Sequence, residues 1–200
     1  MSTPQHIAHE IRSLLSLAHR PVGIQIQEGP LIAEPSPAPL RFCILERQDL
    51  DGGTHRLRLG DIECPGAALA LGMVEPAYVD VEPRIRTPVS SVLVGPIEGA
   101  DQVLFTVTPR QAMTLAVLTG GIEARCTGTH AVCGEVIARV HETGRPHLSL
   151  LCSGMRELCG FGDDELVVGM PWKTFLALPQ AMTRHASLDS REKRRRREDR

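Results

Sequence analysis

Four of the six cysteines in this sequence lie in two similar stretches, and they are the residues best suited to carry chemistry. Each stretch opens with a cysteine, passes a glycine-containing turn and a histidine followed by alternating leucines, and ends in Cys-x-Gly. The first runs from Cys43 to Gly66 and the second from Cys133 to Gly154, with the cysteines 21 and 19 positions apart. This repeat predicts two pseudo-symmetric halves that bring four sulfurs to one site. The alternative is coincidence, since the match is short and gapped.

Four thiolates are a suitable ligand set for a [4Fe–4S] cluster or for a tetrahedral zinc ion. Structural zinc sites usually contain cysteines separated by only two to four residues, and this chain has no such pair. The absence favours the cluster. The predicted metal ligands are therefore Cys43, Cys64, Cys133 and Cys152. Zinc at the same residues is one alternative, and four buried cysteines without a ligand is another, because an unligated cysteine packs like a small apolar residue.

Two of these cysteines are expected at the starts of helices or turns. Cys64 precedes Pro-Gly and Cys152 precedes Ser-Gly, each at the end of an expected strand. A sulfur in such a position faces backbone N–H groups and the positive end of the helix dipole, which favours the thiolate. Small residues nearby leave room for a bulky cofactor, and an arginine could balance its charge or simply lie on the surface. The predicted cofactor-binding residues are Gly66, Gly154 and Arg156.

Cys126 and Cys159 lie outside the repeat, each seven positions from a predicted ligand. We interpret them as packing residues, or as spare thiols near the cluster. A thiol enzyme is a further alternative, in which a histidine acts as the base that activates a cysteine nucleophile. The candidates for these two roles are Cys64, Cys152, His130 and His147. The standard nucleotide-binding, zinc-protease and serine-hydrolase motifs are absent from the sequence.

The segments that must position these residues alternate between strand and helix patterns, which predicts a mixed α/β fold. Residues 101–107 are almost continuously apolar, as expected of a central strand covered on both faces. Thr108 and Pro109 before the next segment, and Gly120 after it, predict a capped helix. Residues 1–186 are predicted to form one globular domain. The segment 187–200 is predicted to be a disordered basic tail, or alternatively an arm that binds nucleic acid or a membrane.

The composition narrows the range of functions. The chain of 200 residues has a net charge of −2, and the last ten residues carry +4, so residues 1–190 carry about −6. An acidic body with only 3 % aromatic residues is poorly suited to bind nucleic acid. No apolar run reaches 18 residues, and the N-terminal segment lacks the apolar core of a secretory signal. We therefore expect a cytoplasmic protein whose cysteines are thiols or ligands.

Several segments together resemble the family called domain of unknown function 169 (DUF169). They are Arg20-Pro21-Val22, CPGAALALG at 64–72, VLFTVTPRQAMTL at 103–115, AVCGEVIARVHETGRPHLSLLCSGMR at 131–156 and DDELVVGMP at 163–171. The resemblance covers residues 10–178 and implies that the family's usual cysteines are the four that the repeat selects. The chain departs from the family at Val107-Thr108, where Gly-Asn is more usual, and at Ser153, where an aromatic residue is more usual. The resemblance implies no particular reaction.

The leading hypothesis is a cytoplasmic iron–sulfur protein with a redox or electron-transfer role, whose reaction the sequence does not specify. The alternative is a non-catalytic module that holds zinc or a small molecule with structural cysteines. A redox partner or a small-molecule ligand is the expected partner, and neither a membrane nor a nucleic acid is expected. The sequence predicts no oligomeric state.

Overall fold

The computed structural model describes residues 3–31, 43, 53–74, 85–95, 98–124 and 132–198, with side chains described to residue 186. The helices are α1 (Pro4–Leu15), the short 3-10 helix η1 (Leu59–Asp61), α3 (Pro65–Ala70), α4 (Pro109–Thr119), α5 (Val132–Thr143), α6 (Ser153–Cys159) and α7 (Trp172–Glu198). The strands are β1 (Val22–Glu28), β2 (His55–Leu57), β3 (Val89–Gly95), β4 (Gln102–Val107), β5 (Glu123–Ala124), β6 (His147–Leu150) and β7 (Leu166–Pro171).

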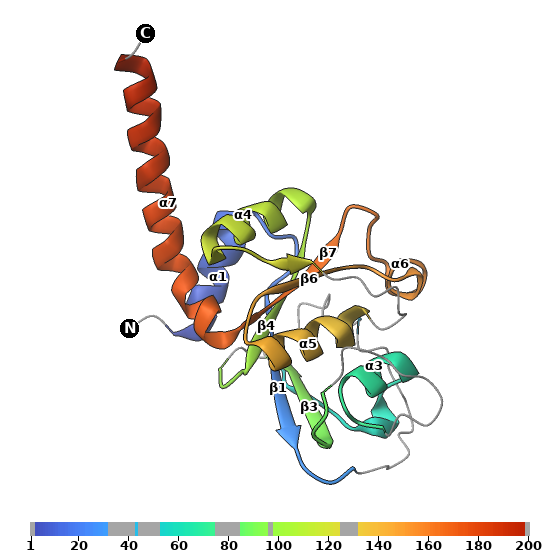
Figure 1. Ribbon diagram of the computed structural model, residues 1–200. Coiled ribbons are helices and arrows are strands. Elements are labelled where there is room, and N and C mark those ends of the chain that lie inside the picture. The colour runs from blue at the N-terminus through green and yellow to red at the C-terminus, as the bar shows by residue number, and fades with distance from the viewer. Residues whose placement is uncertain are drawn as a thin grey trace.

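In the described part of the chain these strands form one seven-stranded sheet, in the order β2-β3-β1-β4-β7-β6-β5. The pairs are antiparallel except for β5 with β6, which are parallel. Helices pack on both faces (Figure 1): α1, α4 and α7 lie on one side, and α3 and α5 lie on the other. The mixed α/β class predicted from the sequence is confirmed.

The strand β4 is the centre of this sheet, between β1 and β7. All six of its residues are buried, which confirms the prediction of a central strand covered on both faces. Because side chains alternate along a strand, Val103 and Phe105 join the core beneath α1, α4 and α7, whereas Leu104 joins the core beneath α3 and α5. The sheet therefore separates two hydrophobic cores, and the five described cysteines belong to the second or pack against it.

Two glycines hold α5 close to its neighbours. A Cβ added at Gly134 would lie 3.0 Å from the Cβ of Ala70 and 3.1 Å from the Cα of Ala67, both in α3. A Cβ added at Gly169, in β7, would lie 2.5 Å from Cγ1 of Val136 in α5. A side chain at Gly169 would overlap Val136, and one at Gly134 would press against α3, so α5 is packed directly against both α3 and the sheet. This packing fixes the end of α5 that carries Cys133.

The capping signals around α4 act as the sequence predicts. The Thr108 side chain accepts a hydrogen bond from the backbone N–H of Gln111, and the Gln111 side chain accepts one from the backbone N–H of Thr108. Gly120 ends the helix in the left-handed conformation. The amide of Gln111 also donates to the backbone carbonyls of Leu15 and Ser16, so the cap of α4 is tied to the end of α1.

The sequence predicts that the segment 187–200 is a disordered tail, and in the structure α7 is described through Glu198. Arginine, lysine and glutamate are strong helix formers, so this charged segment can extend a helix that is already nucleated. Burial of Phe175 and Leu178 anchors the first part of α7 to the core. Among the described residues, none of the helices combines the length and the apolar character needed to cross a membrane.

The predicted division into two pseudo-symmetric halves gains no support. Cys64 does not lie directly at the end of a strand, because β2 ends at Leu57 and η1 follows it. The backbone N–H of Arg58 donates to the carboxylate of Asp61 at 2.8 Å, which favours the helical turn over continued strand. In contrast, β6 leads almost directly to Cys152. The seven strands also form one continuous sheet instead of two matched units.

Candidate functional site: a pocket lined by cysteines

A pocket of about 200 Å³ lies among the cysteines, against the second hydrophobic core. Its lining comes from three separate parts of the chain, namely Cys43, the N-cap of α3, and α6 with its N-cap. The lining residues are Cys43, Cys64, Cys152, Ser153, Gly154, Met155 and Cys159. Three of the four predicted ligands therefore share one pocket, together with a cysteine that the repeat did not select.

The helix α6 forms one wall of this pocket. Cys152 is its N-cap residue, Met155 is fully buried, and Cys159 is its last residue. These positions are three and seven residues apart, which places them on the same face of a helix with 3.6 residues per turn. Cys159 was interpreted as a packing residue or a spare thiol near the cluster, and the structure puts it in the pocket lining. Its seven-residue spacing from Cys152 was the signal in the sequence that could have identified it.

Cys64 enters the pocket as the N-cap of α3, with Pro65 in the first turn, as the sequence predicts. Neither Cys64 nor Cys152 uses its side chain to cap its helix. The Cys64 carbonyl accepts the hydrogen bond of Ala68, and the Cys152 carbonyl accepts those of Met155 and Arg156. The two sulfurs therefore remain outside the capping interactions, at the pocket that both residues line.

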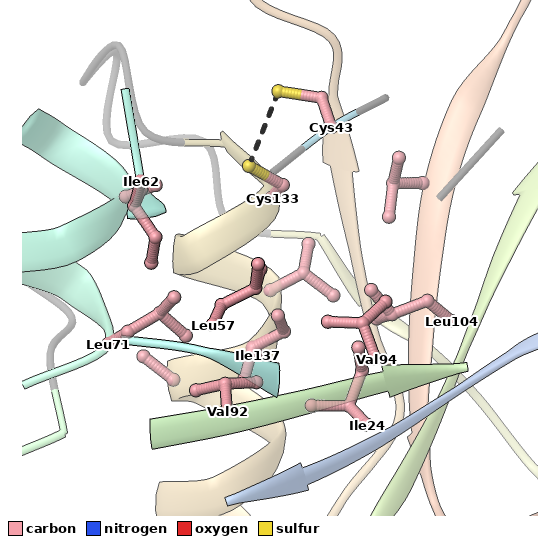
Figure 2. Close-up of a cluster of buried hydrophobic side chains, with 14 of the residues drawn as sticks. Ile24, Cys43, Leu57, Ile62, Leu71, Val92, Val94, Leu104, Cys133 and Ile137 are labelled. Atoms are coloured by element: carbon pink, nitrogen blue, oxygen red, sulfur yellow. Dashed lines mark hydrogen bonds between the residues drawn. The ribbon is translucent and has the colours of Figure 1, made fainter. Parts of the chain in front are cut away.

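Cys133 is placed differently from the other predicted ligands. It lies in α5 and is only 2 % exposed, and it is not among the residues that line the pocket. Its Sγ lies 3.8 Å from the Sγ of Cys43, which does line the pocket. Figure 2 shows the two sulfurs facing each other at the edge of the cluster that contains Leu57 and Ile137. Cys133 is thus connected to the pocket through Cys43.

The arrangement of donors can be compared with what a metal requires. Two sulfurs on one tetrahedral zinc ion, each about 2.3 Å from the metal, lie about 3.8 Å apart. The Cys43–Cys133 pair has this separation. In the described ranges, however, no group of three or more cysteine, histidine or acidic side chains is gathered closely enough to hold a metal ion. The thiols of the lining are suitable ligands for a soft metal or an iron–sulfur cluster. The described side chains, however, are not close enough together to form a site for a single metal ion.

The predicted cofactor-binding residues are not all at the pocket. Gly154 lines it, and a Cβ added there would lie 3.9 Å from the Sγ of Cys152. Gly66 is in α3 but not in the lining. The guanidinium of Arg156 donates to the carbonyl of Gly162 and lies 3.3 Å from a carboxylate oxygen of Asp163. Arg156 therefore holds the turn after α6, and it is not a lining residue.

The proposed bases for a thiol enzyme differ in where they lie. His147 is buried at the start of β6, and its Nε2 is hydrogen-bonded to the hydroxyl of Thr143 at 2.8 Å. It is not part of the pocket lining. His130 and Cys126 lie outside the described residues. None of the five described cysteines forms a disulfide.

Comparison with known proteins gives a family but no activity. The chain is 26 % identical over 102 residues to the uncharacterized protein MJ0308 of Methanocaldococcus jannaschii, a match that covers 46 % of this chain and 44 % of that protein. The chain thus spans less than half of the length of the curated relative that it matches. No solved structure is significantly similar. The family profile DUF169, described as "Uncharacterised ArCR", matches residues 77–181, so the chain belongs to the DUF169 family.

Proposed function

We propose that this protein binds an iron–sulfur cluster in the cysteine pocket and uses it for redox or electron-transfer chemistry. The observation that carries the proposal is the convergence of Cys43, Cys64 and Cys152 on one pocket. These residues are distant in sequence, and Cys64 and Cys152 precede different helices. Packing alone does not require several thiols from distant segments to meet, because aliphatic side chains could fill the same space.

The sequence-derived ligand set adds Cys133 as the fourth ligand. Its Sγ lies 3.8 Å from the Sγ of Cys43, a residue of the pocket lining, which supports this assignment. An iron–sulfur cluster is held by cysteine thiolates and supplies one-electron chemistry, with a potential set by the surrounding hydrogen bonds and solvent exposure. Cys64 and Cys152 are N-cap residues, so each of them lies at the N-terminal end of a helix.

The residues around the sulfurs would control access to such a cluster. Met155 is fully buried and lies in the pocket wall, where its apolar side chain excludes water. Gly154 keeps the space beside the Cys152 sulfur free of a side chain.

The proposal is tested by reconstituting the full chain with ferrous iron and sulfide under anaerobic conditions and recording the visible spectrum. We expect broad absorption that Cys152→Ser abolishes. The matched control is Ser153→Ala, which alters the adjacent lining residue without removing a thiol and should keep the absorption. If the two variants retain equal absorption, Cys152 is not a ligand. If the unmodified chain stays colourless and instead retains one zinc ion through dialysis, the alternative zinc-binding module is correct.

A further inference from the structure

The Cys43–Cys133 pair is the starting point for a further inference. The two sulfurs are 3.8 Å apart, and both residues are buried, at 6 % and 2 % exposure. A disulfide bond brings two sulfurs to about 2.05 Å, so closing this pair requires an approach of about 1.8 Å. Changes of that size are within the reach of side-chain torsions, because rotation about the Cα–Cβ bond moves each sulfur.

The two thiols differ in how a small molecule can reach them. Cys43 lines the pocket of about 200 Å³, whereas Cys133 does not. A reagent that enters the pocket therefore meets Cys43 first, and Cys133 lies behind it. The backbone at Cys133 is also held in place, because the adjacent Gly134 packs closely against α3. This is the arrangement of one attacking thiol and one resolving thiol.

We propose that Cys43 and Cys133 form a dithiol that reacts with low-molecular-weight disulfides entering the pocket. The Cys43 thiolate attacks one sulfur of the disulfide RSSR, so that a mixed disulfide on Cys43 forms and one thiolate, RS⁻, leaves. The Cys133 thiolate then attacks the Cys43 sulfur and releases the second RS⁻. The protein loses two electrons and two protons, the small disulfide is reduced to two thiols, and an intramolecular disulfide remains.

Two of the other pocket thiols, Cys152 and Cys159, are less suited to pair with each other. Cys152 and Cys159 are at opposite ends of α6, and their seven-residue separation corresponds to about 10 Å along a helix. This exceeds the Cα separation of about 7 Å above which a disulfide cannot form without backbone movement. The proposal does not depend on cluster binding, because it requires only the two thiols and the pocket. It does predict that the oxidised chain cannot supply Cys43 to a cluster until the bond is reduced.

The test uses the full chain, reduced and free of metal, treated with 2-hydroxyethyl disulfide and then alkylated for mass spectrometry. We expect the loss of two of the six cysteine thiols and a peptide cross-link between Cys43 and Cys133. Cys133→Ala, which keeps a small apolar side chain in α5, should stop at one mixed disulfide on Cys43. Cys159→Ser is the matched control within the pocket and should keep the Cys43–Cys133 cross-link.

Each outcome decides the proposal. A cross-link between other cysteines, mixed disulfides without a cross-link, or no reaction in the unmodified chain would overturn it. The cross-link map of the unmodified chain needs no variant, so a folding defect in Cys133→Ala would not obscure the result. Cross-linking without iron uptake would support the dithiol and exclude the proposed cluster, and iron uptake without cross-linking would do the opposite.

Discussion

Replacement of Gly134 by alanine tests the packing that fixes Cys133. The new methyl group would lie 3.0 Å from the Cβ of Ala70 and 3.1 to 3.2 Å from the Cα and carbonyl oxygen of Ala67. Two of these three atoms belong to the backbone of α3, so the contact cannot be relieved by rotating a side chain. Overpacking of this kind costs about 2 kcal/mol. Alanine in a helix regains up to about 1 kcal/mol relative to glycine.

The net expectation for Gly134→Ala is a destabilisation of about 1 kcal/mol, which lowers the melting temperature by about 2–4 °C in a protein of this size. Gly154→Ala is the matched control, because this glycine also lies in the first turn of a helix. Its added Cβ would meet nothing closer than the Cys152 sulfur at 3.9 Å. Thermal unfolding followed by circular dichroism measures both variants. If Gly134→Ala is as stable as the unmodified chain or more stable, α3 and α5 do not pack as described.

Three further predictions concern other parts of the chain. Truncation after Ser187 should change the melting temperature by less than about 2 °C, because the buried anchors of α7 precede the cut; a larger decrease would show that the charged segment is docked. In iron assays of serine variants, cofactor should be lost on substitution of Cys43, Cys64, Cys133 or Cys152, whereas Cys159→Ser should retain iron and cost about 1–2 kcal/mol of stability; equal retention in all variants would remove the ligand assignment. Arg156→Lys should retain iron but lower stability by about 1 kcal/mol in urea unfolding, since it weakens the bonds to the turn at Gly162; loss of iron with unchanged stability would restore a cofactor-binding role for this arginine.

The elements that the sequence predicted correctly are those determined by local rules. Thr108 and Gly120 cap α4 because a hydroxyl can accept from a backbone N–H and because glycine tolerates a positive φ, and both properties are visible in the sequence. The same holds for Cys64 as an N-cap followed by proline. The burial of β4 could be predicted from the apolar residues Val103, Leu104 and Phe105 at its centre. These features require no knowledge of the rest of the fold.

The features that were not predicted depend on distant contacts or on competition between local interactions. The order of strands in the sheet is set by tertiary packing, and no residue pattern specified that β4 lies between β1 and β7. The apparent repeat depended on matching histidines and leucines, but the Asp61 carboxylate turns the chain at Arg58 and ends the similarity. Cys159 lines the pocket because its spacing places it on the same face of α6 as Cys152, whereas Cys133 lies in α5 and is not among the lining residues.

The content of iron, acid-labile sulfide and zinc in anaerobically purified protein tests the central claim most directly. A [4Fe–4S] cluster in the cysteine pocket predicts about four iron and about four sulfide ions per chain in brown protein that bleaches in air. Substitution of Cys152 by serine should remove both together. A colourless protein that takes up neither iron nor sulfide on reconstitution, and that holds one zinc ion per chain through dialysis, would contradict the iron–sulfur proposal.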